Sequence, residues 1–143
     1  MKKGRNKISA TAEAEYLADV ALAANFTDLL SRAQEAEHGF RSAQALGAPV
    51  SEQYPLAREL DEALTDVTRA AYAAERAEIG PLGYEDRIYR RKAKATASVH
   101  AWTDEAERLL TLRETHRLTG FPARPIAEAI GAEIARLPDE SHA

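Results

Sequence analysis

The sequence predicts an all-α fold, and three observations lead to this prediction. Alanine dominates the apolar residues of this 143-residue chain, which is 45% hydrophobic, and alanine is the strongest helix former. The residues that favour strands are sparse, and aromatic residues make up only 6% of the chain. Apolar residues recur at spacings of three and four over long stretches, which is the period of one helix face. We therefore expect an antiparallel bundle of three long helices plus a short C-terminal helix.

The length of the chain suits a single domain. We expect residues 1–8 to form a flexible basic arm, residues 9–137 to form one helical-bundle domain and residues 138–143 to form a polar tail. The basic start looks like the first part of a secretion signal, but Glu13 and Asp19 interrupt the apolar run that follows it. No stretch approaches the about 18 apolar residues of a membrane span. These observations predict a cytoplasmic protein with no membrane partner.

The first helix is predicted from Ser9 to Leu46, with a serine well suited to cap its start. Gly39 is a point where this helix can bend, and Gly47 with Pro49 ends it. One apolar stripe runs along the helix and is formed by Tyr16, Val20, Ala23, Phe26, Leu30, Ala33, Phe40 and Ala43.

The second helix is predicted from Pro55 to Ile79, because proline is tolerated in a first helical turn. Gly80, Pro81 and Gly83 end it and form a short connection, so the next helix should return beside it. Many positions of its stripe are alanine, which lets a neighbouring helix approach closely. The stripe consists of Leu56, Leu60, Ala63, Leu64, Val67, Ala70, Ala71, Ala74 and Ala77.

The third helix is predicted as one unbroken element from Tyr84 to Thr119, and we expect it to be the central helix of the bundle. It contains the only tryptophan and the densest run of positive charge, with neither proline nor glycine. Its apolar residues have the seam spacing of a coiled coil, which indicates packing at a shallow crossing angle. The seam consists of Ile88, Ala95, Val99, Trp102, Ala106, Leu109 and Leu110.

Helix lengths predict where apolar residues remain exposed. At about 1.5 Å per residue, the third helix should project beyond its neighbours by roughly its last two turns. The short helix from Pro125 to Leu137 can fold over this projection or pair with a second copy. Exposed apolar ends favour self-association. The expected protein-binding residues are Tyr16, Leu17, Leu112, Leu118, Ile126, Ile130 and Ile134. The function predicted first is therefore a non-enzymatic protein–protein interaction module, a small accessory or adaptor protein that forms homo-oligomers and is carried by a phage or plasmid.

Four basic residues lie on one face of the third helix, because Arg87, Arg90, Arg91 and Lys94 follow the spacing i, i+3, i+4 and i+7. The simpler interpretation is that they pair with Glu75 and Glu78 across the connection, as surface charges commonly do. The alternative is a strip that binds the phosphates of DNA or RNA, where nearby tyrosines can stack on bases. The net charge of −4 favours the first interpretation.

The residue patterns of catalytic and metal sites are mostly missing. The chain has no cysteine, which excludes thiol chemistry and cysteine zinc sites. A di-metal site in a bundle needs two Glu-x-x-His pairs, and the sequence has only one, at Glu35 and His38. Neither a placed serine nucleophile nor a glycine-rich phosphate loop occurs. We expect no catalytic residues, no metal, no cofactor and no small-molecule substrate.

Overall fold

The computed structural model describes residues 8–122, and within this range all regular elements are helical. The predicted all-α class is confirmed for these residues. The basic arm, the predicted C-terminal helix with Ile126, Ile130 and Ile134, and the polar tail lie outside the described residues, apart from Ile8 at the end of the arm. The elements are α1 (Ala10–Ala23), α2 (Phe26–Ala45), α3 (Val50–Ile79), the 3-10 turn η2 (Pro81–Tyr84), α4 (Arg87–Lys94), α5 (Ala97–Thr115) and the π-helical turn η3 (His116–Gly120).

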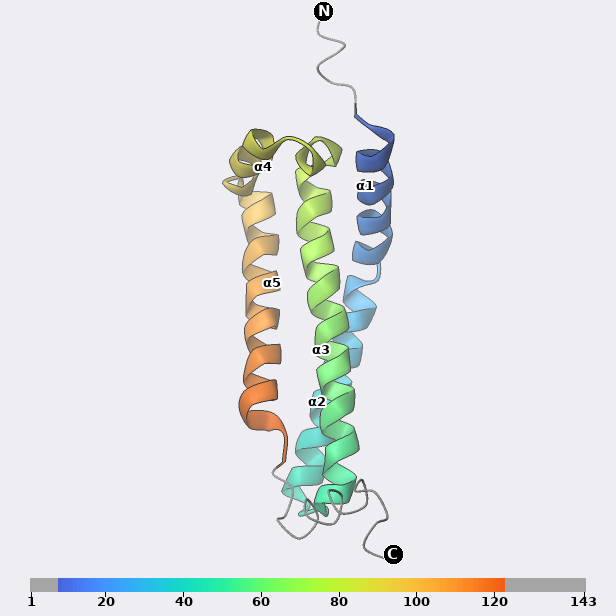
Figure 1. Ribbon diagram of the computed structural model, residues 1–143. Coiled ribbons are helices and arrows are strands. Elements are labelled where there is room, and N and C mark those ends of the chain that lie inside the picture. The colour runs from blue at the N-terminus through green and yellow to red at the C-terminus, as the bar shows by residue number, and fades with distance from the viewer. Residues whose placement is uncertain (1–7, 123–143) are drawn as a thin grey trace, which may run out of the picture.

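The helix at the centre of the molecule is α3. It contacts α1, α2 and α5, and Figure 1 shows α5 on one side of it, α1 on the other and α2 running behind it. Most of its predicted stripe is buried, with Leu56 and Ala77 only partly so, and the alanines there let the neighbouring helices approach closely. The expectation that Tyr84–Thr119 is the central helix is wrong. The core cluster consists of Ala33, Ala36, Phe40, Ala57, Leu60, Ala63, Leu64, Val67, Ala71, Ala106 and Leu109.

The predicted first helix is two helices. The chain breaks at Ala24 and Asn25, where Asn25 has φ −92° and ψ 3°, whereas α2 continues through Gly39. Asparagine disfavours the interior of a helix because its side chain competes for the backbone. The break positions Phe26 against Trp102 of α5, with ring centroids 5.0 Å apart in a T-shaped arrangement.

The connection from α2 to α3 is made by Gly47 at φ +71°, a conformation that glycine adopts without strain. The Ala48 N–H donates to the Ala43 carbonyl and the Gly47 N–H donates to the Gln44 carbonyl. The predicted end of this helix is therefore confirmed. The next helix, α3, starts at Val50, five residues before the predicted Pro55.

The predicted third helix is also broken. Thr96 is extended (φ −74°, ψ 152°) at the start of α5, so α4 turns across the end of the bundle instead of continuing α5 (Figure 1). The two seam residues before the break are exposed: Ile88 is 66% exposed, and Ala95 is exposed as well. Their predicted burial is wrong. Beyond the break the seam prediction is confirmed in part, because Val99, Ala106 and Leu109 are buried, whereas Trp102 and Leu110 are half-buried.

The break also removes the predicted projection. Residues 80–96 form η2, α4 and the connections beside them, so they do not extend α5 along α3. The end of α5 consequently lies level with the start of α3. His116 Nε2 donates to the Ala57 carbonyl at 2.8 Å, and the Phe121 ring lies 5.6 Å from that of Tyr54. Within residues 8–122, α5 does not outrun its neighbours.

Candidate nucleic-acid interface

The connection between α3 and α4 holds α4 at one end of the bundle. Gly80 has φ +103°, which favours glycine, and Pro81 starts η2. A side chain at position 83 would collide with the Cγ2 atom of Ile79, so glycine is needed there as well. Asp86 then caps α4 by accepting a hydrogen bond from the Tyr89 N–H at 2.9 Å.

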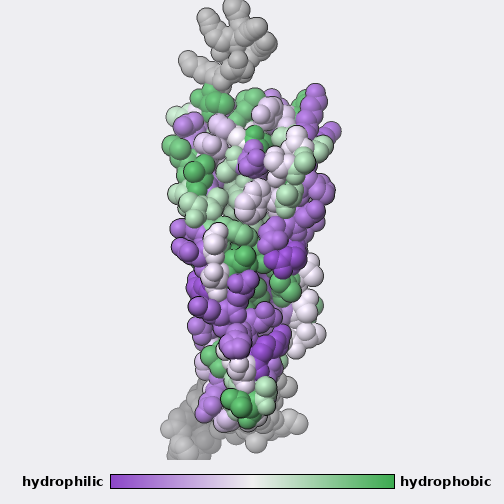
Figure 2. Space-filling view, turned by 180° about the vertical axis from the view of Figure 1, so that it is seen from behind, coloured by the Kyte–Doolittle hydropathy of each residue, from purple (hydrophilic) through white to green (hydrophobic). Residues whose placement is uncertain are grey.

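The four predicted basic residues lie on one face of α4, which we call the basic face. Their side chains line a shallow hollow of about 410 Å³. Arg90 is half-buried and donates to the Gly83 carbonyl at 2.6 Å, while Arg87, Arg91 and Lys94 are exposed. Seen from behind in Figure 2, strongly hydrophilic side chains gather at the corner of the molecule where α4 lies. The predicted sharing of one face is confirmed.

The predicted pairing of the basic face with Glu75 and Glu78 is absent. Glu75 is only 5% exposed, and its carboxylate accepts a hydrogen bond from the Thr103 hydroxyl of α5. Glu78 is exposed on α3. Among residues 8–122, neither carboxylate forms an ion pair, and none of the four basic side chains forms one. The simpler interpretation is therefore wrong, because the turn of α4 across the bundle takes its cations away from the flank of α3.

Positive charge is concentrated in two segments of the sequence, residues 1–7 and α4. The chain has 19 Lys and Arg against 23 Asp and Glu. Nine of the basic residues lie in residues 1–7 and in α4, where no acidic residue occurs, so the rest of the chain has ten against 23 and a net charge of −13. The Ser9 N–H donates to the Glu85 carboxylate at 3.2 Å, so the described chain begins beside the start of α4. Net charge averaged over the whole chain conceals this asymmetry.

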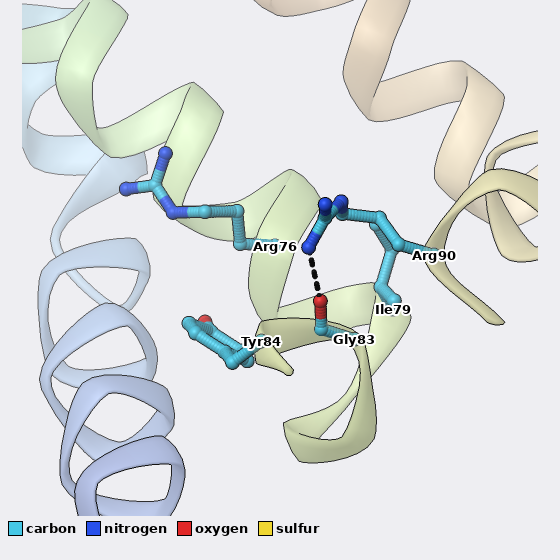
Figure 3. Close-up of a pocket in the computed structure, with 5 residues that line it drawn as sticks. All are labelled: Arg76, Ile79, Gly83, Tyr84 and Arg90. Atoms are coloured by element: carbon cyan, nitrogen blue, oxygen red, sulfur yellow. Dashed lines mark hydrogen bonds between the residues drawn. The ribbon is translucent and has the colours of Figure 1, made fainter. Parts of the chain in front are cut away.

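A small cavity adjoins the basic face, and we call it the slot. It has a volume of about 120 Å³ and is lined by Arg76, Ile79, Gly83, Tyr84 and Arg90. Figure 3 shows Arg76 and Tyr84 on one side and Arg90 with Ile79 on the other, with the Arg90 guanidinium bonded to the Gly83 carbonyl and the Arg76 guanidinium turned toward α1. The sequence did not predict the slot, because segment 80–83 was interpreted as an ordinary turn. The available signal was that Gly80 and Gly83 lie close in the sequence to Tyr84 and Arg90.

Asp19 of α1 fixes one wall of the slot. Its carboxylate accepts from Arg76 Nε at 2.8 Å and Nη2 at 3.1 Å, and from the Tyr84 hydroxyl at 2.5 Å. Burial alone raises the pKa of Asp19, but the hydrogen bonds from Arg76 and Tyr84 outweigh it, so the pKa lies below its ordinary value. Burial and the hydrogen bond to Asp19 together raise the pKa of Tyr84 well above its usual range. Tyr84 therefore stays a neutral donor, and its ring is held in place.

The predicted protein-binding residues divide into three groups. Tyr16 is half-buried and packs edge-on against Tyr84, with ring centroids 6.3 Å apart, and its role in protein binding stays a prediction. Leu17 is 55% exposed on α1, while Leu112 and Leu118 are 43% and 82% exposed at the far end of the molecule. Leu112 also lines a cavity of about 100 Å³ with Leu60 and Leu64 of α3. The three isoleucines form the remaining group, outside the described residues.

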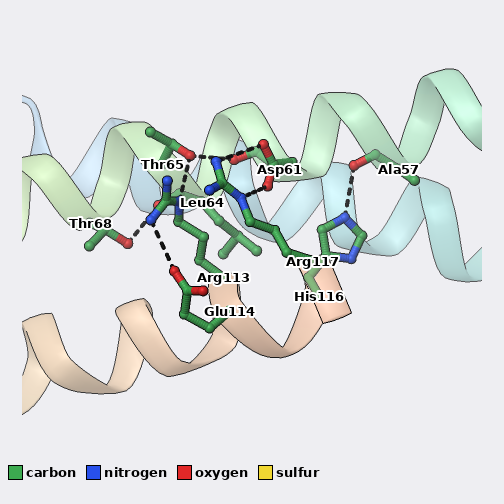
Figure 4. A network of polar contacts seen from close by, with 9 residues as sticks. All are labelled: Ala57, Asp61, Leu64, Thr65, Thr68, Arg113, Glu114, His116 and Arg117. Atoms are coloured by element: carbon green, nitrogen blue, oxygen red, sulfur yellow. Dashed lines mark hydrogen bonds and ion pairs between the residues drawn. The ribbon is translucent and has the colours of Figure 1, made fainter. Parts of the chain in front are cut away.

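The far end of α5 is held to α3 by a network of polar contacts (Figure 4). Arg117 forms an ion pair with Asp61 at 2.7 Å, and Arg113 Nε donates to the Thr65 hydroxyl at 2.9 Å. Between them His116 is only 5% exposed and lies between the rings of Phe40 and Phe121. The arginines at this end are thus engaged within the protein, unlike Arg87 and Arg91 of the basic face.

The part of the chain that the structure describes contains no candidate metal-binding site. Among residues 8–122, no group of three His, Cys, Asp or Glu side chains is arranged to hold a metal ion. His38 is exposed, as predicted. His100 is also a surface residue and lies 3.2 Å from the carboxylate of Asp104.

Comparison with protein-family models, with curated proteins and with solved structures finds no match for this chain. None of the helices between residues 8 and 122 is both long enough and apolar enough to cross a membrane. Any account of function therefore depends on the physical properties of the basic face, the slot and the exposed leucines.

Proposed function

We propose that this protein is a non-enzymatic nucleic-acid-binding module that contacts phosphate groups through the basic face of α4. The observation that carries the proposal is that Arg87, Arg91 and Lys94 are exposed around one hollow and form no ion pair within residues 8–122, in a chain that has 23 acidic residues. Cations kept apart from so many available carboxylates are suited to an external anion. In this proposal the scaffold is an antiparallel three-helix bundle, in which α3 lies between α5 and the pair formed by α1 and α2.

The mechanism is electrostatic. Basic side chains that contact phosphates displace the counterions condensed on the nucleic acid. The release of these ions drives binding. The cations are long side chains on a short helix, so they can reach a phosphate backbone. Contacts to phosphates carry no information about base sequence. The net charge of −13 on the remainder of the chain repels a polyanion. Binding in this proposal is therefore confined to the basic segments. Such a module acts wherever nucleic acid is accessible, which agrees with the predicted cytoplasmic location.

Nucleic acid fits the basic face better than a lipid surface does. An interfacial helix needs a continuous apolar face that can be buried among lipid chains. The eight residues of α4 offer only Ile88 and Tyr89 as large exposed apolar side chains. Aromatic and cationic side chains in alternation are instead typical of surfaces that bind nucleic acid strands.

The test is the binding of a fluorescently labelled oligonucleotide, measured by anisotropy at low ionic strength. The variant R87E/R91E should lose at least about tenfold in affinity, because two phosphate contacts become repulsive. The matched control is R58E/R69E, which changes the same net charge at two exposed arginines of α3. Equal loss in both variants would show that only net charge matters, and the absence of wild-type binding would end the proposal.

The salt dependence of the same binding gives a second measure. Four phosphate contacts predict a slope of log affinity against log salt of about −3 for a single strand. A slope near zero would contradict phosphate binding. A slope much steeper than about −3 would indicate that the basic arm adds contacts of its own.

A second candidate function is a protein contact at the far end, and the exposure of Leu118 favours it. Leu118 is 82% exposed and Leu112 is 43% exposed, and large exposed apolar side chains can mark sites of association. This is the self-association predicted from the sequence. Light scattering should then find an oligomer that L118E converts to a monomer, whereas a wild-type monomer at all concentrations would remove this candidate.

A further inference from the structure

We infer that the slot is a binding site for one unpaired nucleobase, so that the protein binds nucleotide units of a single strand. This inference depends on the proposed function, because the phosphates of the same strand would lie on the basic face. Arg90 joins the two sites: it lines both the hollow of the basic face and the slot. An anionic chain on the basic face therefore passes directly beside the slot.

The size of the slot selects a small flat group. Its volume of about 120 Å³ is below the roughly 300 Å³ of a pocket for a drug-sized molecule. It equals the space of about four water molecules, which suits a single pyrimidine ring better than a peptide segment. A flat ring in the slot would lie against the apolar side chain of Ile79 and beside the ring of Tyr84.

The rim of the slot offers donors to the edge of a base. Asp19 engages Nε and Nη2 of Arg76, so that guanidinium is turned toward α1 and the donors at the slot come from Arg90. Arg90 uses Nη1 for the Gly83 carbonyl, which leaves Nε and Nη2. Guanidinium groups donate to carbonyl and ring-nitrogen acceptors and also stack on flat rings. The slot thus combines an apolar interior with donors at its mouth, as a base requires.

The slot is formed before any ligand arrives. Tyr84 is held by Asp19 on one side and by the Tyr16 ring on another, and the absence of a side chain at Gly83 lets that residue pack directly on Ile79. A preformed site loses little conformational entropy on binding. A base inside a duplex is stacked and paired, so it would have to leave the duplex to enter. The protein should therefore prefer single strands to duplexes.

The decisive experiment changes the ligand and leaves the protein intact. Anisotropy compares a labelled oligothymidylate with an abasic strand of the same length, which has the same phosphates, and with a duplex of equal length. The oligothymidylate should bind about tenfold more tightly than the abasic strand, the gain typical of stacking one base on an aromatic surface. Equal affinity for both strands, or preference for the duplex, would overturn the inference. Loss of all binding would instead reject the proposed function.

The variant R90K gives a second test, because it keeps the positive charge of the basic face and removes the planar donors from the slot. The preference for oligothymidylate over the abasic strand should fall from about tenfold to none, whatever loss of affinity the two strands share. Circular dichroism checks that the variant folds. An equal loss for both ligands would contradict a separate base site.

Thymidine monophosphate, used as a competitor, separates a strand from a free nucleotide as the ligand. It should compete weakly, because it brings a single phosphate to the basic face. Affinity of the mononucleotide equal to that of the oligomer would overturn the assignment of a strand.

Discussion

The helices α3 and α4 differ in how their residues are used. Twelve of the 30 residues of α3 are buried, and its alanines bring α1, α2 and α5 close to one axis. None of the eight residues of α4 is buried, and five of them are basic. A helix that contributes nothing to the core is free of packing constraints, so its side chains can serve a ligand. The fold therefore depends on α3, whereas the proposed binding depends on α4.

The largest expected effect is on stability, at the centre of the core. Phe40 is fully buried and packs with Ala57 and Leu60 of α3. Phe40→Ala should lower the free energy of unfolding by about 3–5 kcal/mol, because it removes apolar contacts and leaves a cavity. Chemical denaturation measures this change. Oligonucleotide affinity of the remaining folded protein should be unchanged, and a parallel loss of affinity would contradict the separation.

A smaller effect is expected where α1 joins the slot. Asp19→Asn removes the charge that pairs with Arg76 and should cost roughly 1 kcal/mol of stability, since the Arg76 side chain is 46% exposed and its pairing is partly screened. Denaturation curves check this value. A loss comparable with that of Phe40→Ala would show that this end belongs to the core.

The same pair predicts a pH dependence. The pKa of Asp19 is lower in the folded protein than its ordinary value of 3.8. Its pairing therefore stabilises the fold above pH 3.8, and this contribution is lost as pH falls through the folded pKa. The difference in stability between wild type and Asp19→Asn should be full at neutral pH and should vanish in acid. A difference that grows as pH falls would contradict the sign of the shift.

The smallest stability effect is expected on α4 itself. R87E/R91E should change the free energy of unfolding by less than about 0.5 kcal/mol, because both side chains are exposed and unpaired within the described residues. Thermal unfolding measures it. A large destabilisation would show that the basic face supports the fold and would weaken the case for a ligand.

The sequence predicted the helical class and most of the seam of α3, because the stripe around Leu60, Leu64 and Val67 follows one helix face without interruption. It did not predict the two breaks, since neither Asn25 nor Thr96 is a glycine or a proline. A signal was present at the second break: the second row of the seam, Val99 and Ala106, continues back to Lys92, between Ile88 and Ala95. An apolar row that becomes charged there has no core to join.

The candidate site was half predictable. The spacing from Arg87 to Lys94 placed the cations on one face, but their separation from Glu75 follows from the break at Thr96 and the buried hydrogen bond to Thr103. The slot required the conformation of Gly80 and the contact of Gly83 with Ile79, which are tertiary features. Residue spacing predicts which side chains share one face of a helix. The partners of that face depend on where the chain turns between helices.

The central claim is that the end of the molecule with α4, and not the surface along α3, meets the ligand. Titration of the isotopically labelled protein with oligothymidylate, followed by NMR, tests it directly. The account predicts that chemical-shift changes concentrate on the backbone amides of residues 76–96. Changes centred on Leu112 to Leu118, or no change at low ionic strength, would contradict it.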